Sequence, residues 1–314
     1  MTALLLQLLH MALVLALAPG ITGLVRKLKA RLVGRRGPPV VQPYRDLVRL
    51  LRKDAVVAHS ASWLFRVTPY LVFTAIWLGA SLIPTITTNL LLGPTADLIA
   101  LAALLGSARF FTALAGLDVG TSFGGIGASR EMMIASLAEP AMLVVIFTVS
   151  LLIGSTSLTV IADSLISHPV GIRVSLGLGL IALMIVAIAE NARVPVDNPA
   201  THLELTMVHE AMILEYSGRH LALMEAAAML KLLLYIALIA CIFLPFGMAQ
   251  ADGGEALLRG LGSYLAKVLG GTVILALFET SLAKMRVFRV SEFLAAALLL
   301  GLLAMILLYV TKGL

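Results

Sequence analysis

Long, continuously apolar runs recur along this chain, and they restrict it to one class of fold. A helix needs roughly 20 apolar residues to cross the ~30 Å hydrocarbon core of a bilayer, where only helices and closed barrels satisfy the backbone. The runs do not alternate between polar and apolar residues, as strands of a membrane barrel do. Of the 314 residues, 60% are hydrophobic and 13% are charged, about half the charged fraction of a soluble domain. The sequence therefore predicts an all-α, polytopic membrane protein that forms a single domain over residues 1–314.

We predict about eight transmembrane helices from these runs. No Lys or Arg precedes the first run, and positive charge follows it, which favours a retained span over a signal peptide cleaved near Ala18. The predicted spans lie near residues 3–25, 67–89, 96–117, 139–161, 172–190, 226–248, 263–282 and 291–311.

The distribution of basic residues sets the predicted orientation. Nearly half of the 23 Lys and Arg residues lie between Arg26 and Arg66, directly after the first span. Because cytoplasmic loops of membrane proteins are enriched in Lys and Arg, topology explains the net charge of +6 better than nucleic-acid binding does. We expect a multi-pass protein of the inner (cytoplasmic) membrane with both termini on the outer, periplasmic side. Its cytoplasmic loops would be residues 26–66, 118–138, 191–225 and 283–290.

The first cytoplasmic loop is predicted to contain an amphipathic helix at the membrane surface. A Gly-Pro-Pro break precedes residues 44–54, where Leu47, Leu50 and Leu51 share one helical face and basic residues surround it. Two interpretations stay open, a docking surface for a partner subunit and an anchor that faces lipid. The residues expected to dock a partner are Arg35, Arg36, Tyr44, Arg45 and Asp46.

The second loop, residues 118–138, is rich in glycine. Some glycine-rich loops bind phosphates, but this one lacks the Gly-Lys-Ser/Thr ending of a P-loop and no strand precedes it. We expect a tight re-entrant loop that lines a cavity. Asp118 and Arg130 are predicted to shape it, and Glu131 and Glu139 to take part in proton transfer beside it.

Acidic residues and histidines concentrate in the third loop, residues 191–225. Pro195 and Pro199 end the preceding helix, and a new helix is predicted over residues 201–216. We expect Arg193 and Pro195 to hold the shape of this loop. On the predicted helix, Glu204 would align with Glu215, and His202 with His209.

The acids of the third loop favour a proton relay. Carboxylates at a low-dielectric boundary have raised pKa values, and histidine titrates near neutral pH. A solvated acidic loop that binds a basic neighbour is the alternative, although the apolar residues between the acids favour burial. Charges inside the spans, at Arg109, Lys231 and Glu279, support a buried pathway. The predicted relay consists of Glu190, Asp197, His202, Glu204, His209, Glu210, Glu215, Glu131, Glu139 and Lys231.

Metal binding has little support in the sequence. His209 and Glu210 begin a zinc-binding His-Glu-x-x-His pattern, but Ile213 occupies the position of the second histidine. The single cysteine, Cys241, cannot by itself ligate an iron–sulfur cluster. We therefore expect no metal site in this chain.

Four short motifs, spread over most of the chain, give it a family resemblance. They are Gly-Arg-Arg-Gly-Pro-Pro over 34–39, Gln-Pro-Tyr-Arg-Asp over 42–46, Glu-Asn-Ala-Arg-x-Pro-x-Asp over 190–197 and Glu-Tyr-Ser-Gly over 215–218. Together they resemble the complex I subunit 1 family, whose members join a redox arm to proton-pumping subunits. In the quinone-using branch the acidic loop usually continues Phe-Asp-Leu-Pro-Glu-Ala-Glu-Ser-Glu, whereas residues 196–204 here read Val-Asp-Asn-Pro-Ala-Thr-His-Leu-Glu. Residues 109–131 are similar to subunits of hydrogenase-4, formate hydrogenlyase and energy-converting NiFe hydrogenases.

The resemblance implies a membrane subunit that holds no redox centre, is not catalytic alone and couples a cytoplasmic redox arm to ion translocation. The implied partners are hydrogenase-like large and small subunits, carrying iron–sulfur clusters and a NiFe centre, and antiporter-like membrane subunits. The first alternative is the quinone-chamber subunit of an NADH dehydrogenase-like respiratory complex, which would bind quinone. The second is a stand-alone secondary transporter, although no internal repeat relates the two halves of the chain.

Overall fold

The computed structural model of the chain describes residues 2–167, 173–197, 207–250, 253–283 and 285–312. Within these residues the fold consists of helices, with two isolated β-bridges and no strand. The helices are α1 (Thr2–Leu32), α2 (Gln42–Leu51), α3 (Trp63–Leu82), the 3₁₀ helix η1 (Gly93–Thr95), α4 (Leu98–Asp118), α5 (Ser122–Ile153), α6 (Leu158–Ser167), α7 (Val174–Glu190), α8 (His209–Ile213), α9 (Gly218–Phe243), α10 (Gly254–Ser281) and α11 (Val287–Lys312).

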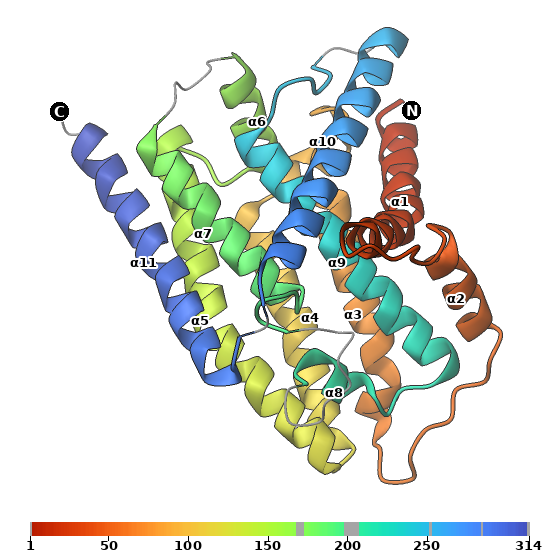
Figure 1. The fold of residues 1–314 in the computed structure, drawn as a ribbon. Coiled ribbons are helices and arrows are strands. Elements are labelled where there is room, and N and C mark those ends of the chain that lie inside the picture. Colours follow the sequence, from red (N-terminus) through yellow and green to blue (C-terminus); the bar gives the residue numbers. More distant parts are fainter. Residues whose placement is uncertain (1, 168–172, 198–206, 251–252, 284, 313–314) are drawn as a thin grey trace.

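The apolar helices confirm the predicted class, an all-α polytopic membrane protein. Seven helices of the described residues are long and apolar enough to cross a membrane, and α7 adds a shorter apolar helix of 17 residues. These eight helices overlap the eight predicted spans. In Figure 1 both termini lie at the end of the bundle away from α8, as an even number of crossings requires.

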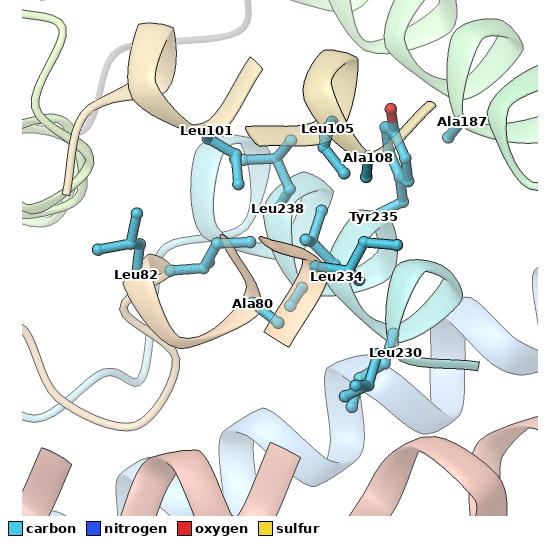
Figure 2. Close-up of a cluster of buried hydrophobic side chains, with 14 of the residues drawn as sticks. Ala80, Leu82, Leu101, Leu105, Ala108, Ala187, Leu230, Leu234, Tyr235 and Leu238 are labelled. Carbon is cyan, nitrogen blue, oxygen red and sulfur yellow. The ribbon is translucent and has the colours of Figure 1, made fainter. Parts of the chain in front are cut away.

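Helix α9 is the centre of the bundle. About two thirds of its most apolar window is buried, 67%, against 22–44% for the other six long helices. Leu230, Leu234, Tyr235 and Leu238 are buried on α9 and belong to one cluster with residues of α3, α4 and α7 (Figure 2). Burial inside protein rather than lipid lets α9 carry polar groups that a lipid-facing helix would not tolerate. The neighbours labelled in Figure 2 are Ala80, Leu82, Leu101, Leu105, Ala108 and Ala187.

The predicted amphipathic helix is present as α2, which packs against α1 and α9. Its Leu47 lies against the main hydrophobic core, while Arg45 and Arg49 are exposed. Close approach to α1 depends on Gly23, where a Cβ atom would lie 2.1 Å from the carbonyl oxygen of Val40. The segment leading into α2 therefore lies directly on the first transmembrane helix.

The prediction of a re-entrant loop over residues 118–138 is wrong. Residues Ser122–Ile153 form one helix, α5, whose first turn is capped by the Thr121 hydroxyl accepting from the Gly124 amide. The glycines permit close helix packing instead of a loop: a Cβ atom at Gly124 would lie 2.1 Å from the Gly116 carbonyl oxygen on α4.

The helix predicted over residues 201–216 is also wrong in the part that is described, where α8 covers only His209–Ile213. Tyr216 explains why the helix ends early. Its ring stacks on Phe65 with centroids 4.0 Å apart, and its hydroxyl donates to the Phe65 carbonyl oxygen at 3.1 Å. Ser217 then exchanges hydrogen bonds with the backbone of Val56, so the chain leaves the helix to dock on the α2–α3 connection.

Candidate functional site: a buried ion network

Arg109 lies in the middle of the network, on a buried face of α4. Its guanidinium forms an ion pair with Glu190 at the end of α7. On α5, its Nη1 atom lies 3.1 Å from Glu139 Oε1 and its Nε atom lies 3.7 Å from Glu131 Oε1. One planar cation therefore ties three helices together, and the partners offset the cost of burying its charge.

Lys231 extends the network to the central helix α9. Its Nζ atom lies 3.0 Å from Glu190 Oε2, so the two oxygens of Glu190 contact two different cations. The Glu190 side chain is only 1% exposed. With every group ionised, the network holds two cations and three carboxylates, and one negative charge remains.

Two cavities with lining residues in common lie between the network and the acidic loop. The smaller, of about 50 Å³, is lined by Arg109, Glu131, Glu190, His209 and Lys231 among others. The larger, of about 460 Å³, is bordered by the ends of α1, α7 and α9 and by the acidic loop, and it shares His209 with the smaller one. A polar cavity of this size has room for hydrogen-bonded water. The charged and titratable side chains around the larger cavity are Arg26, Lys29, Arg193, Asp197, His209, Glu210 and Glu225.

Three residues of the acidic loop, Asp197, His209 and Glu210, line the larger cavity. Asp197 is 3% exposed, and its Oδ2 atom accepts a hydrogen bond from the Val208 amide at 3.3 Å. Burial, together with the negative charges of Glu225 and Asp197, raises the pKa of Glu210 to about 7. Burial lowers the pKa of His209, while the nearby Glu131 carboxylate opposes that change. The raised pKa of Glu210 agrees with the direction expected for carboxylates at a low-dielectric boundary.

A second buried ion cluster lies beside the larger cavity. Glu279 on α10 has a side chain that is 0% exposed, with Lys29 Nζ 2.5 Å from one oxygen and Arg193 Nη1 3.5 Å from the other. Burial lowers the pKa of Arg193, and the Glu279 carboxylate opposes that change. This cluster attaches the acidic loop to α1 and α10.

The residues predicted to shape the loops make specific contacts. Arg130 Nη1 donates to the Met207 carbonyl oxygen at 2.7 Å, and Asp118 Oδ2 accepts from the Ser62 amide at 2.8 Å. The Pro195 carbonyl oxygen accepts from the Met285 amide at 2.8 Å. Each contact joins segments distant in sequence, so these residues position the loops around the cavities.

The structure brings together only part of the predicted relay. Glu131, Glu139, Glu190, Asp197, His209, Glu210 and Lys231 gather around the two cavities, or contact Arg109. Glu215 lies in the turn before α9 and lines neither cavity. His202 and Glu204 lie outside the described residues. Among the predicted docking residues, Arg35, Arg36 and Arg45 are exposed and Tyr44 and Asp46 are half-buried.

Arg109 and Glu225 are residues of the site that the predicted relay omits. The sequence identifies Arg109 as a single basic residue inside an apolar run, but it does not show the partners of this residue. Within the described residues, no group of three or more His, Cys, Asp or Glu side chains is arranged to hold a metal ion.

The fold and the network define a polytopic helical membrane protein with charged groups buried between its helices. The chain belongs to the family described as NADH dehydrogenase, which it matches over residues 4–310. This membership confirms the predicted family.

Comparison with individual proteins refines the placement. The chain is 35% identical to formate hydrogenlyase subunit 4 of Escherichia coli K12 over 271 residues, covering 86% of this chain and 87% of that protein. It is also 35% identical to hydrogenase-4 component C of the same organism over 272 residues, or 87% and 85% of the two chains. An NADH-quinone oxidoreductase subunit of Bacteroides fragilis is 27% identical over 241 residues, 74% of this chain and 66% of that protein.

A solved structure shares the fold. A chain of the membrane-bound sulfane sulfur reductase, an archaeal respiratory membrane complex, superposes with a TM-score of 0.84 at 20% identity, covering 98% of this chain and 100% of that one. Together the relatives indicate a membrane subunit of a complex I-like hydrogenase or respiratory complex.

Proposed function

We propose that this chain is the membrane-anchor and proton-coupling subunit of a complex I-like hydrogenase of the hydrogenase-4 or formate hydrogenlyase type. It would link a cytoplasmic redox arm to ion-translocating membrane subunits. The observation that carries the proposal is the Glu190 carboxylate, which is shared between Arg109 and Lys231 beneath the acidic loop. The two relatives at 35% identity support the hydrogenase branch.

The network suggests how charge would move. A change of charge in the redox arm would alter the protonation of Glu210, His209 and Asp197, which face the larger cavity. His209 also lines the smaller cavity, so it is placed to pass a proton toward Glu190. A proton on Glu190 would weaken its attraction for Lys231 and Arg109, and Arg109 would then pair more strongly with Glu139. The signal thereby reaches α5 without a redox centre in this chain.

The surroundings of the network suit this role. Hydrogenase-like large and small subunits, with iron–sulfur clusters and a NiFe centre, would dock on the first and third loops. The exposed Arg35, Arg36 and Arg45 would meet them there. Antiporter-like subunits would lie against the lipid-facing helices. The excess of Lys and Arg in the first loop supports an inner-membrane protein with both termini on the outer side.

Purification of the native membrane complex tests the proposal. Subunit identification by mass spectrometry, together with nickel analysis and an assay of H₂ evolution, should find a hydrogenase-like large subunit and H₂ production. A complex that contains no nickel and transfers electrons only to quinone would contradict the proposal.

The second candidate is a quinone-chamber subunit, which the size of the larger cavity favours. Its volume of about 460 Å³ falls within the ~300–1,000 Å³ typical of small-molecule sites. In that case Asp197, His209 and Glu210 would face a quinone head group. Stoichiometric quinone extracted from the purified complex, and quinone-dependent electron transfer, would support this candidate over the first.

A further inference from the structure

An apolar groove lies on the bundle between α7, α9 and α10, helices that can be followed in Figure 1. Its volume is about 340 Å³, within the range of sites that hold small molecules. Helices α7 and α10 both line it, and α9 forms its floor through residues such as Leu232, Ile236 and Ile239. Gly270 and Gly271 of α10 contribute no side chain, which widens the groove on that side.

The groove has one charged group without a partner. The Nζ atom of Lys267 is buried and has no hydrogen-bond partner among the residues that the structure describes. It lies over the face of the Phe246 ring, 5.0 Å from the ring centroid, in a cation–π contact. One turn earlier on α10, the buried hydroxyl of Ser263 also lacks a partner within the described residues. Burying an ammonium beside an apolar space is energetically costly unless an anion lies close enough to pair with it.

Lys267 lies at the end of the groove where α9 ends, at Phe243 and Leu244, whereas Asn191 and Arg193 mark the opposite end. Arg193 already pairs with Glu279, so Lys267 is the cation that needs an anion. Because α9 is long and apolar enough to cross a membrane, its end at Phe243 is expected near the boundary away from the acidic loop. The apolar walls therefore run from a cation near one boundary toward the opposite leaflet, the arrangement that an amphiphile with an acyl chain requires.

We propose that this groove binds an anionic phospholipid, with an acyl chain between α7 and α10 and the phosphate at Lys267. Within the described part of the chain, no carboxylate lines the groove. A zwitterionic lipid would bring an ammonium that finds no partner there, so net negative charge is favoured. A transmembrane helix of another subunit would need a carboxylate at the level of Lys267 to satisfy the same charge.

Native mass spectrometry of the full chain, purified in mild detergent, tests this site. Phosphatidylglycerol or phosphatidylcholine is added, and bound lipids per chain are counted. We expect one retained phosphatidylglycerol, with Lys267→Gln lowering its occupancy about fivefold and Lys267→Arg keeping it. Gly270→Leu fills the groove and should also remove the lipid, because a Cβ atom there meets nothing within 4 Å. Gly262→Leu is the matched control, since it adds the same side chain to α10 in open space outside the groove.

The outcomes are distinguishable once size-exclusion chromatography shows that each variant is folded. Loss of phosphatidylglycerol in Lys267→Gln and Gly270→Leu, but not in Gly262→Leu, supports the site. Equal retention in all variants, or equal binding of phosphatidylcholine, overturns it. So does a photo-cross-linker at Gly270 that captures a protein subunit, rather than a lipid, in the native complex.

Discussion

Replacing Glu190 by glutamine isolates the energetic role of the network. The substitution keeps the size of the side chain and removes the charge that Arg109 and Lys231 share. Arg109 retains Glu139 at 3.1 Å and Glu131 at 3.7 Å. Glu190 is the one ion-pair partner of Lys231 in the described chain, so most of the cost falls on Lys231.

Breaking a buried ion pair by removing one partner costs about 3–5 kcal/mol, because the other charge stays buried. We expect Glu190→Gln to lie near the lower end of that range, since Arg109 keeps two carboxylates. Adding Lys231→Met removes the uncompensated charge and should recover about 1–3 kcal/mol. The free energy of unfolding can be measured by far-UV circular dichroism in mixed micelles of rising denaturing-detergent content.

Glu255→Gln is the matched control for this measurement. Glu255 and Arg259 form an ion pair whose side chains are 93% and 79% exposed, so its loss should leave the unfolding free energy unchanged within error. If Glu190→Gln unfolds like the control, or if Lys231→Met fails to recover stability in the Glu190→Gln background, the reasoning about a shared buried carboxylate is refuted.

Two further predictions concern the acidic loop and the glycine-rich helix. The pKa of Glu210 is raised from 4.5 to about 7, so the folded state binds an extra proton between these pH values. The free energy of unfolding should therefore fall by up to about 3 kcal/mol as pH rises through this range. Glu210→Gln should remove that dependence in unfolding curves recorded from pH 4 to 8; an unchanged slope contradicts it. Gly124→Ala should lower the free energy of unfolding by about 1–3 kcal/mol, because its Cβ atom would meet the Gly116 carbonyl oxygen. Gly125→Ala, where a Cβ atom meets nothing within 4 Å, should leave it unchanged. Equal melting temperatures of the two variants would contradict this prediction.

The helices that cross the membrane are predictable because lipid imposes a length and an apolar composition on each span. The same reasoning fails at residues 118–138, where glycines suit both a tight loop and close helix packing. The structure distinguishes the two through contacts such as that of Gly124 with Gly116 on α4. The reasoning fails again near Tyr216, whose stacking on Phe65 ends a helix that local sequence favours. Both errors come from contacts between distant segments.

The sequence predicts many of the residues of the candidate site, but not which of them pair with one another. A charge inside an apolar run identifies Arg109, Lys231 and Glu279 as unusual residues. The sequence does not show that Glu190 joins two of them, nor that Glu279 pairs with Lys29 and Arg193 in a separate cluster. Those pairings depend on how α1, α4, α7, α9 and α10 pack.

The proton-to-H₂ ratio of the assembled complex in sealed membrane vesicles tests the central claim most directly. A complex carrying Glu190→Gln with Lys231→Met should keep its subunits and evolve H₂, but should move fewer protons per H₂ than the wild type. The Glu255→Gln complex serves as the control and should keep the wild-type ratio. A wild-type ratio in the double variant would contradict the claim that this network couples redox chemistry to proton movement.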